Sequence, residues 1–103
     1  MQFSDDLNVT ATDQSVSMQD MEENQKKVRG YYQQLNCYFM CGTAYVKLGR
    51  FERAVYPMTR CTEIMPQNYK YFYERAKVYQ NLQMFEEAVA DYTTVLESNP
   101  NLA

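Results

Sequence analysis

The sequence contains no histidine and has few of the residue patterns that build catalytic centres. It shows no glycine-rich phosphate loop, no nucleophile elbow and no HExxH-type helix. Its cysteine thiols therefore have no imidazole beside them to act as an activating base. Because an active site needs converging groups with tuned acidity, the sequence predicts a protein that is not an enzyme and that holds no cofactor.

Cysteine is also scarce, with Cys37, Cys41 and Cys61 making an odd number. An odd count without a sign of export argues against a disulfide framework and favours reduced thiols in the cytoplasm. Cys37 and Cys41 stand at i, i+4 and Cys61 could join them, but a closed zinc site needs four ligands. We therefore expect no metal site, with Cys41 and Cys61 as small core residues and Cys37 as a surface thiol.

Long apolar runs and an excess of positive charge are missing too. No run approaches the roughly 18 apolar residues of a membrane span, and no leader or lipidation signal is seen. The net charge is −3 and the pI is about 4.9, without a basic stripe. These features argue against nucleic acid as a partner and against membrane insertion.

The negative charge lies in the first 30 residues, where six acids meet three bases. This segment has few large apolar groups and cannot bury enough surface to offset the entropy of ordering. We expect residues 1–30 to be an acidic, mostly disordered tail that ends at Gly30. Within it, Ser17 could cap a short helix over 18–28. Met18, Met21, Gln25 and Val28 would lie roughly along one face of this helix.

The rest of the chain contains one 34-residue pattern twice, at 35–68 and 69–102. Unrelated segments of this length would share roughly two identities, whereas these share nine, so the repeat is genuine. The identical pairs are Tyr45/Tyr79, Leu48/Leu82, Phe51/Phe85, Glu52/Glu86, Ala54/Ala88, Val55/Val89, Thr59/Thr93, Glu63/Glu97 and Pro66/Pro100.

Apolar residues recur in each copy at spacings of three and four, which predicts two helices per repeat. Gly49 should end the first helix, Pro66 should end the second, and Asn68 should cap the third. No sustained period-two stretch or hairpin turn competes. The short turns predict an all-α fold of tandem antiparallel helix-turn-helix hairpins.

The repeats resemble the tetratricopeptide repeat, a 34-residue helical hairpin. The resemblance covers residues 35–102, and we assign 31–68 and 69–103 to the two repeats. It is carried by Tyr38, Gly42, Tyr45, Ala54 and Pro66 in the first copy and by Phe72, Ala76, Tyr79, Ala88, Tyr92 and Pro100 in the second. The resemblance implies an adaptor or scaffold that binds protein partners.

In this family the first helices of the hairpins line a concave groove for a peptide or a partner helix. The matching positions here are Asn36, Phe39, Thr43, Val46, Lys47, Lys70, Tyr73, Lys77, Gln80 and Asn81. Three lysines among aromatic rings suit an acidic, partly apolar peptide. Phe39, Thr43 and Glu74 stand where relatives that clamp chaperone tails carry basic or amide residues, so that ligand is not expected.

The two copies differ at paired positions. Gly49 corresponds to Gln83, which should be strained if a left-handed residue is still needed there. Pro57 lies inside the second helix and corresponds to Asp91, while Cys41 corresponds to Arg75. We infer an ion pair between Arg75 and Asp91 that braces the second repeat.

Repeat arrays generally need three units and a capping helix, and the sequence contains two. The last helix should therefore leave an apolar face partly uncovered, made of Val89, Tyr92, Val95 and Leu96. Three alternatives stay open: a structural subunit of a larger assembly, a homo-oligomer, or a piece of a longer array. As a further hypothesis, the acidic residues 13–23 could occupy the groove of their own chain.

Overall fold

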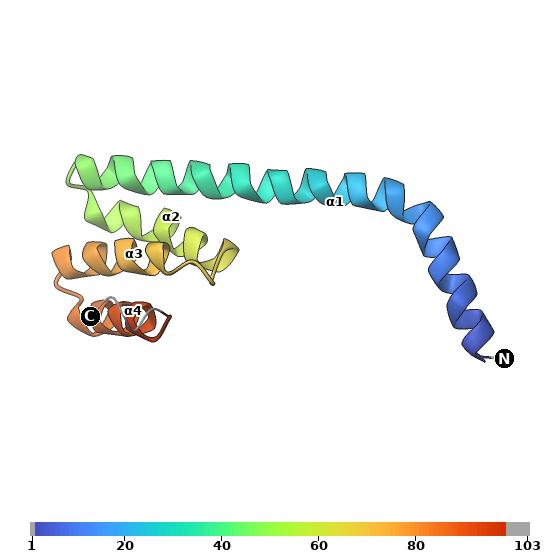
Figure 1. Ribbon diagram of the computed structural model, residues 1–103. Coiled ribbons are helices and arrows are strands. Elements are labelled where there is room, and N and C mark those ends of the chain that lie inside the picture. The colour runs from blue at the N-terminus through green and yellow to red at the C-terminus, as the bar shows by residue number, and fades with distance from the viewer. Residues whose placement is uncertain (1, 99–103) are drawn as a thin grey trace. The chain divides into compact units, whose positions relative to one another are not determined.

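The computed structural model describes residues 2–98, with side chains for residues 18–98, and every regular element in this range is a helix (Figure 1). The elements are α1 (Gln2–Lys47), α2 (Phe51–Ile64), α3 (Tyr69–Asn81) and α4 (Phe85–Ser98). The helices pack as pairs, which confirms the predicted all-α architecture of helical hairpins.

The chain forms two compact units that divide after Tyr32, inside α1. The unit that starts at Gln33 holds the C-terminal part of α1 together with α2, α3 and α4. In it α2 packs on α3 and α3 packs on α4, so the helices follow one another in space in chain order (Figure 1). The described residues of the unit before Gln33 all belong to the N-terminal part of α1.

Helix α1 is longer than the sequence predicts. It begins at Gln2 and contains Gly30, so the break expected at that glycine does not occur. A glycine inside a helix costs about 1 kcal/mol relative to alanine, which weakens a helix without ending it. Glu22 and Glu23 precede Lys26 and Lys27 by four residues, a spacing that favours helix. That residues 1–30 behave as a separate tail stays a prediction.

The turns inside the two repeats close in the same way. The Arg50 N–H donates to the Tyr45 carbonyl at 2.8 Å, and the Met84 N–H donates to the Tyr79 carbonyl at 2.8 Å. This closure requires a left-handed residue just before the donor. Gly49 supplies it with φ 74°, and Gln83 adopts it with φ 63°. The strain predicted at Gln83 is therefore present.

The connection between the repeats also follows the sequence. Helix α2 ends at Ile64, two residues before Pro66. The Asn68 side chain then accepts a hydrogen bond from the Lys70 N–H at 3.0 Å and caps α3 as predicted. The stop and the cap together reverse the chain direction within a few residues.

The core lies where the helices approach most closely. Ala54, Met58 and Val78 form its buried centre. A Cβ added to Gly42 would stand 2.8 Å from the Met58 Cε, so a larger residue there would force the buried Met58 side chain to shift. Ala76 is also fully buried. The small residues of the repeat thus occupy close helix contacts, as expected.

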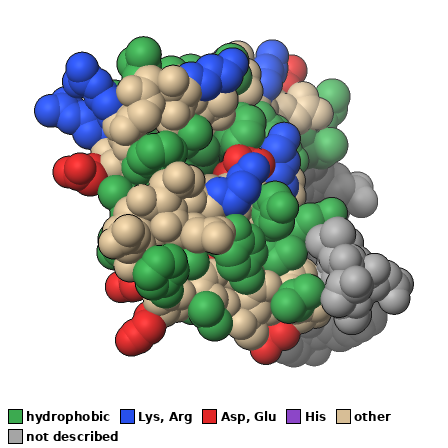
Figure 2. All heavy atoms as spheres, turned by 90° about the vertical axis from the view of Figure 1, so that its left-hand side faces the viewer, with side chains coloured by type: hydrophobic (Ala, Val, Ile, Leu, Met, Phe, Trp, Pro, Cys, Tyr) green, Lys and Arg blue, Asp and Glu red, His purple; other side chains and the backbone are tan. Residues whose placement is uncertain are grey.

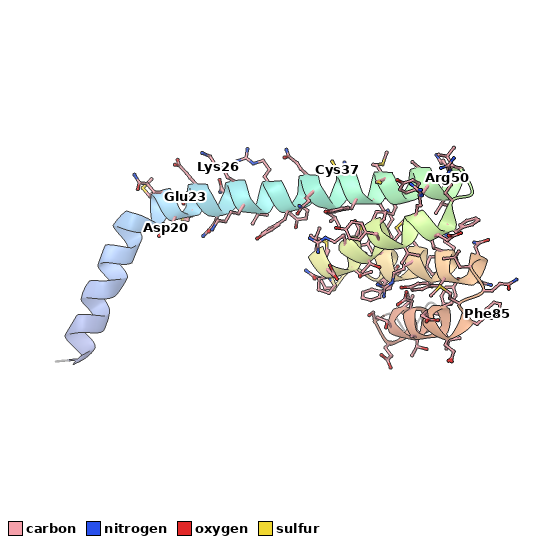
Figure 3. The ribbon with its side chains drawn as sticks, turned by 180° about the vertical axis from the view of Figure 1, so that it is seen from behind. Asp20, Glu23, Lys26, Cys37, Arg50 and Phe85 are labelled. Atoms are coloured by element: carbon pink, nitrogen blue, oxygen red, sulfur yellow. The ribbon has the colours of Figure 1, made fainter. Side chains whose placement is uncertain are left out.

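Two core assignments need correction. Cys41 is exposed, although the sequence predicts a core position for it. Its counterpart Arg75 is covered because α2 packs against the face of α3 that carries Arg75. No described helix of the same unit packs against the equivalent face of α1, which carries Cys41. Cys37 is exposed as expected, on the side of α1 away from α2 (Figure 3). Val78, only 2% exposed, is a core residue that the periodicity did not single out.

None of the helices in the described part of the chain combines the length and the apolar character needed to cross a membrane.

Candidate functional site

Arg75 holds the second repeat together and joins it to the first. Its Nε donates to the Asp91 Oδ2 at 2.7 Å and its Nη2 to the Asp91 Oδ1 at 2.8 Å, a bidentate pair between α3 and α4. Its Nη1 donates to the Thr59 Oγ1 at 3.2 Å and to the Thr62 Oγ1 at 3.4 Å, both on α2. The bond to Asp91 raises the pKa of the Arg75 guanidinium. The inferred ion pair is therefore present, and it reaches further than the sequence indicated.

The surface over α1 and α3 is built from lysine and aromatic side chains. The Lys70 Nζ lies 4.7 Å from the centre of the Phe39 ring, and Phe39 packs edge-on against Tyr71 with ring centres 5.5 Å apart. These contacts join α1 to α3, because Phe39 comes from α1 and the other two residues from α3. The first helices of the two hairpins thus form one continuous surface.

A second lysine and ring pair lies further along α3. The Lys77 Nζ is 5.1 Å from the centre of the Tyr73 ring, and Tyr73 packs against Tyr92 of α4 with ring centres 5.7 Å apart. Lys77 also forms an ion pair with Glu74 at 3.3 Å. Since both side chains of this pair are partly exposed to solvent, the pair is worth between about 0 and 1 kcal/mol. Lys77 can therefore exchange Glu74 for another carboxylate at little cost.

A hollow of about 580 Å³ opens beside Lys77. It is lined by Lys77, Gln80, Asn81, Gln83, Phe85 and Tyr92. The Tyr92 hydroxyl donates to the Gln80 Oε1 at 2.9 Å, and burial raises the pKa of this hydroxyl, so it stays a neutral donor. The hollow is large enough for one or two side chains of a ligand. Figure 2 shows one face of the molecule on which basic side chains stand among exposed hydrophobic ones.

Lys77 also lines a smaller hollow of about 140 Å³. It is lined by Val46, Phe51, Glu74, Lys77, Val78 and Asn81. Val46 comes from α1 and Phe51 from the start of α2, so this hollow spans both repeats. Lys77 and Asn81 line both hollows, which makes this turn of α3 the centre of the candidate site.

The structure brings together most but not all of the groove residues expected from the sequence. Phe39, Val46, Lys70, Tyr73, Lys77, Gln80 and Asn81 take part in the contacts or hollows described above. Asn36 and Lys47 are exposed and Thr43 is half-buried, and none of these three lines either hollow. The site is thus centred on α3 more than on α1.

Six residues that line the two hollows were not among the predicted groove residues: Phe51, Glu74, Val78, Gln83, Phe85 and Tyr92. Phe51 and Phe85 could have been found from the sequence. They are the same residue at equivalent positions of the two repeats, and each directly follows a turn. Phe85 is 59% exposed at the start of α4 (Figure 3). Only the folded chain shows that Phe85 and Gln83 line the same hollow.

The expected uncovered face of α4 is smaller than predicted. Val89 is 62% exposed and Leu96 is 45% exposed, as anticipated. Val95, however, is 4% exposed and belongs to the interior, because it faces back toward the repeat and not outward. Tyr92 is half-buried between Tyr73 and the larger hollow. The face therefore reduces to Val89 and Leu96.

Cys61 differs from the two other thiols. It is fully buried, its Sγ–H points to the Leu35 carbonyl at 3.7 Å, and desolvation raises its pKa from 9.0 to about 11. A thiol with that pKa is almost wholly protonated and unreactive near neutral pH. Cys37 and Cys41 remain as exposed thiols on α1.

Comparison with known families agrees with this geometry. Two family models, both described as tetratricopeptide repeat, match residues 35–68 and 69–102. No curated protein matches the chain. The matched boundaries coincide with the internal repeat found in the sequence, and such repeats are generally protein–protein interaction modules. The chain therefore belongs to the tetratricopeptide repeat family, of which it carries two tandem repeats.

Proposed function

We propose that the chain is a non-catalytic adaptor that binds an acidic, partly apolar peptide along the surface formed by α1 and α3. One observation carries the proposal: Lys77 lines two hollows, one polar and bordered by Phe85, the other shared by both repeats. A cation flanked by hollows for side chains is the arrangement that recognises a carboxylate next to an apolar residue.

The lysines of this surface are held weakly by their own chain. A cation over an exposed aromatic ring is worth about 0.5–1 kcal/mol, so the contacts of Lys70 with Phe39 and of Lys77 with Tyr73 position the ammonium groups without saturating them. Each ammonium has three donors, and a ring face satisfies none of them fully. A ligand carboxylate can bind while the ring contact remains.

Apolar contact area is available next to each charge. Phe85 is 59% exposed and Tyr73 is 43% exposed. Burying aromatic side chains contributes most of the binding energy in many interfaces. We therefore expect the ligand to place an apolar side chain in the larger hollow and a carboxylate on Lys77.

The test uses a labelled extended peptide that alternates glutamate with leucine, together with its glutamine analogue, and measures binding by fluorescence anisotropy. Lys77→Glu should weaken binding of the glutamate peptide at least tenfold, which is about 1.4 kcal/mol. Lys27→Glu reverses the charge of another exposed lysine, outside the site; it is the matched control and should leave binding within about twofold. The glutamine analogue should bind more weakly than the glutamate peptide.

Equal affinities for the two peptides would contradict the proposed recognition of carboxylates. An equal loss from Lys77→Glu and Lys27→Glu would show that binding depends on net charge alone. Either result removes the site from consideration.

A second candidate is a structural role, in which another protein covers the exposed part of α4. Val89 and Leu96 are large apolar side chains that remain 62% and 45% exposed. Val89→Asp should then abolish co-purification with the assembly and leave peptide binding at Lys77 unchanged. If Val89→Asp instead lowers the melting temperature of the isolated chain by several degrees, the face is internal to this chain and the candidate fails.

We also propose a cytoplasmic location. Cys37 and Cys41 are exposed free thiols, and such thiols persist where the compartment is reducing. Quantifying alkylated cysteines after rapid quenching of cells tests this: reduced Cys37 and Cys41 support the location, and oxidised forms contradict it.

A further inference from the structure

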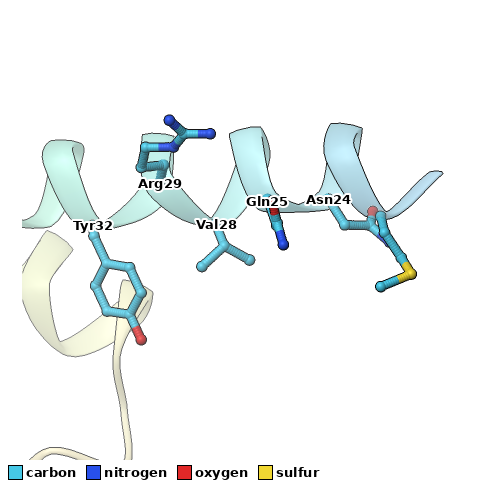
Figure 4. A pocket seen from close by; sticks show the side chains of 6 residues that line it. Asn24, Gln25, Val28, Arg29 and Tyr32 are labelled. Carbon is cyan, nitrogen blue, oxygen red and sulfur yellow. The ribbon is translucent and has the colours of Figure 1, made fainter. Parts of the chain in front are cut away.

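A second apolar face lies on α1, in the unit before Gln33. Met18, Met21, Gln25, Val28 and Tyr32 follow one another at spacings of three, four, three and four residues. Such a pattern keeps side chains on one side of a helix and is the repeat of a two-helix seam. Figure 4 shows Gln25, Val28 and Tyr32 pointing to the same side of α1.

This face is bare within its unit. Met18 is 73%, Met21 56%, Val28 49% and Tyr32 54% exposed. A hollow of about 360 Å³ runs along it, lined by Met21, Asn24, Gln25, Val28, Arg29 and Tyr32. In the described residues of this unit α1 is the one element, so no neighbour within the unit covers the face. An amphipathic helix gains stability when such a face is buried against another element.

The charges around the face are arranged in two blocks. Three acids lie at 20–23 and three bases at 26–29, with no charge of the other sign inside either block. Two such helices side by side and parallel would set acids beside acids and bases beside bases. Placed antiparallel, each acidic block would meet the basic block of the other helix. The segment is therefore complementary to a second copy of itself in the antiparallel direction.

The charges nearest the face agree with this direction. Glu22 directly follows Met21, and Arg29 directly follows Val28, so both charges flank the face on the same edge. In Figure 4 the Arg29 guanidinium points away from the apolar side chains, while its stem lines the hollow. Antiparallel helices bring like edges together, and hence Glu22 close to Arg29 of the other helix.

We propose that a second copy of this chain covers the face, with the two α1 helices antiparallel and Glu22 paired with the partner's Arg29. In this register Met21 packs against the partner's Tyr32, and Gln25 lies opposite the partner's Val28. A polar residue at a seam position weakens association but selects one register. The contact joins two chains outside the peptide surface at Lys77 and is independent of it.

Sedimentation equilibrium of the full chain over a series of micromolar concentrations tests the proposal. The wild type should show a monomer–dimer equilibrium. Glu22→Arg and Arg29→Glu each place like charges together and should raise the dissociation constant about tenfold or more. The double variant carrying both changes restores opposite charges and should dimerise within about threefold of the wild type, and an equimolar mixture of the two single variants should also associate.

Val28→Glu adds a charge on the face and should abolish the dimer, whereas Gln19→Glu adds the same charge off the face and should not. A wild type that stays monomeric throughout the series overturns the proposal. This is also the result expected if the acidic segment binds its own chain. A double variant that associates no better than the single variants also overturns it. Binding of the glutamate peptide is measured on the same variants and should not change.

Discussion

One side chain, Arg75, connects three helices. It binds Asp91 on α4 in bidentate fashion and reaches Thr59 and Thr62 on α2. It also lies over the Phe72 ring, 5.6 Å from its centre. Asp91 is 5% exposed and has no other charged partner among the described residues. The position is thus a polar centre inside an otherwise apolar stack.

Asp91→Ala should lower the free energy of unfolding by about 3 kcal/mol, because it leaves a largely buried guanidinium without its counter-ion. The matched control is Glu63→Ala, which removes the exposed Arg60–Glu63 pair on α2 and should cost less than about 1 kcal/mol. Urea unfolding followed by circular dichroism measures both. Similar losses for the two variants would contradict the role assigned to Arg75.

Gln83 is the other residue with a measurable energetic consequence. A residue with a Cβ in the left-handed region pays about 1 kcal/mol or more that glycine does not, and Gln83 has φ 63°. Gln83→Gly should therefore raise the free energy of unfolding by about 1 kcal/mol, a shift of several degrees in melting temperature for a domain of this size. Gln83→Ala keeps the Cβ and should change little, so equal effects from glycine and alanine would refute the strain.

At the scale of elements, α1 contains two glycines with opposite surroundings. A Cβ at Gly42 would meet the Met58 side chain at 2.8 Å, while nothing lies within 4 Å of the position a Cβ would take at Gly30. The same residue type therefore permits close packing with α2 at one position. At the other it only weakens the helix.

Gly42→Leu should destabilise the repeats by about 1–3 kcal/mol, because the larger side chain forces α1 and α2 apart. Gly30→Leu is the control and should leave their melting temperature unchanged while raising the helical signal of α1, since leucine favours helix by nearly 1 kcal/mol over glycine. Calorimetry and far-ultraviolet circular dichroism separate the two effects. A neutral Gly42→Leu would show that the close approach is not needed.

At the scale of the whole molecule, the buried Cys61 thiol makes stability depend on pH. Its pKa is raised from 9.0 to about 11 in the folded chain. The unfolded chain therefore loses this proton first as the pH rises, so the stabilisation is complete below pH 9 and is lost progressively up to about pH 11. The loss is on the order of 3 kcal/mol.

Cys61→Ala should be less stable than the wild type at neutral pH, because it removes a buried sulfur, but its stability should fall less steeply above pH 9. The tyrosines titrate in both proteins, so the difference between the two curves isolates the thiol. Urea unfolding at intervals between pH 8 and about 11 measures it. Parallel curves would show that Cys61 is accessible to solvent.

The sequence alone determined the repeat, the two helices of each repeat and the family, but not the extension of α1 through Gly30. These follow from local causes: a period of three to four residues for each helix, a left-handed turn at Gly49, a stop at Pro66 and a cap at Asn68. Comparison of the two copies was also enough to infer the pair of Arg75 with Asp91, because both positions change together between the repeats.

Only the tertiary structure decided which faces are covered. Cys41 and Arg75 are equivalent in sequence, yet α2 covers the second while no described helix of the unit covers the first. Val78 is buried for the same reason, in the core with Ala54 and Met58 of α2. The hollows around Lys77 likewise combine residues from separate elements. Helical periodicity records where a side chain points, whereas burial depends on which neighbour lies there, and that is a property of the folded chain.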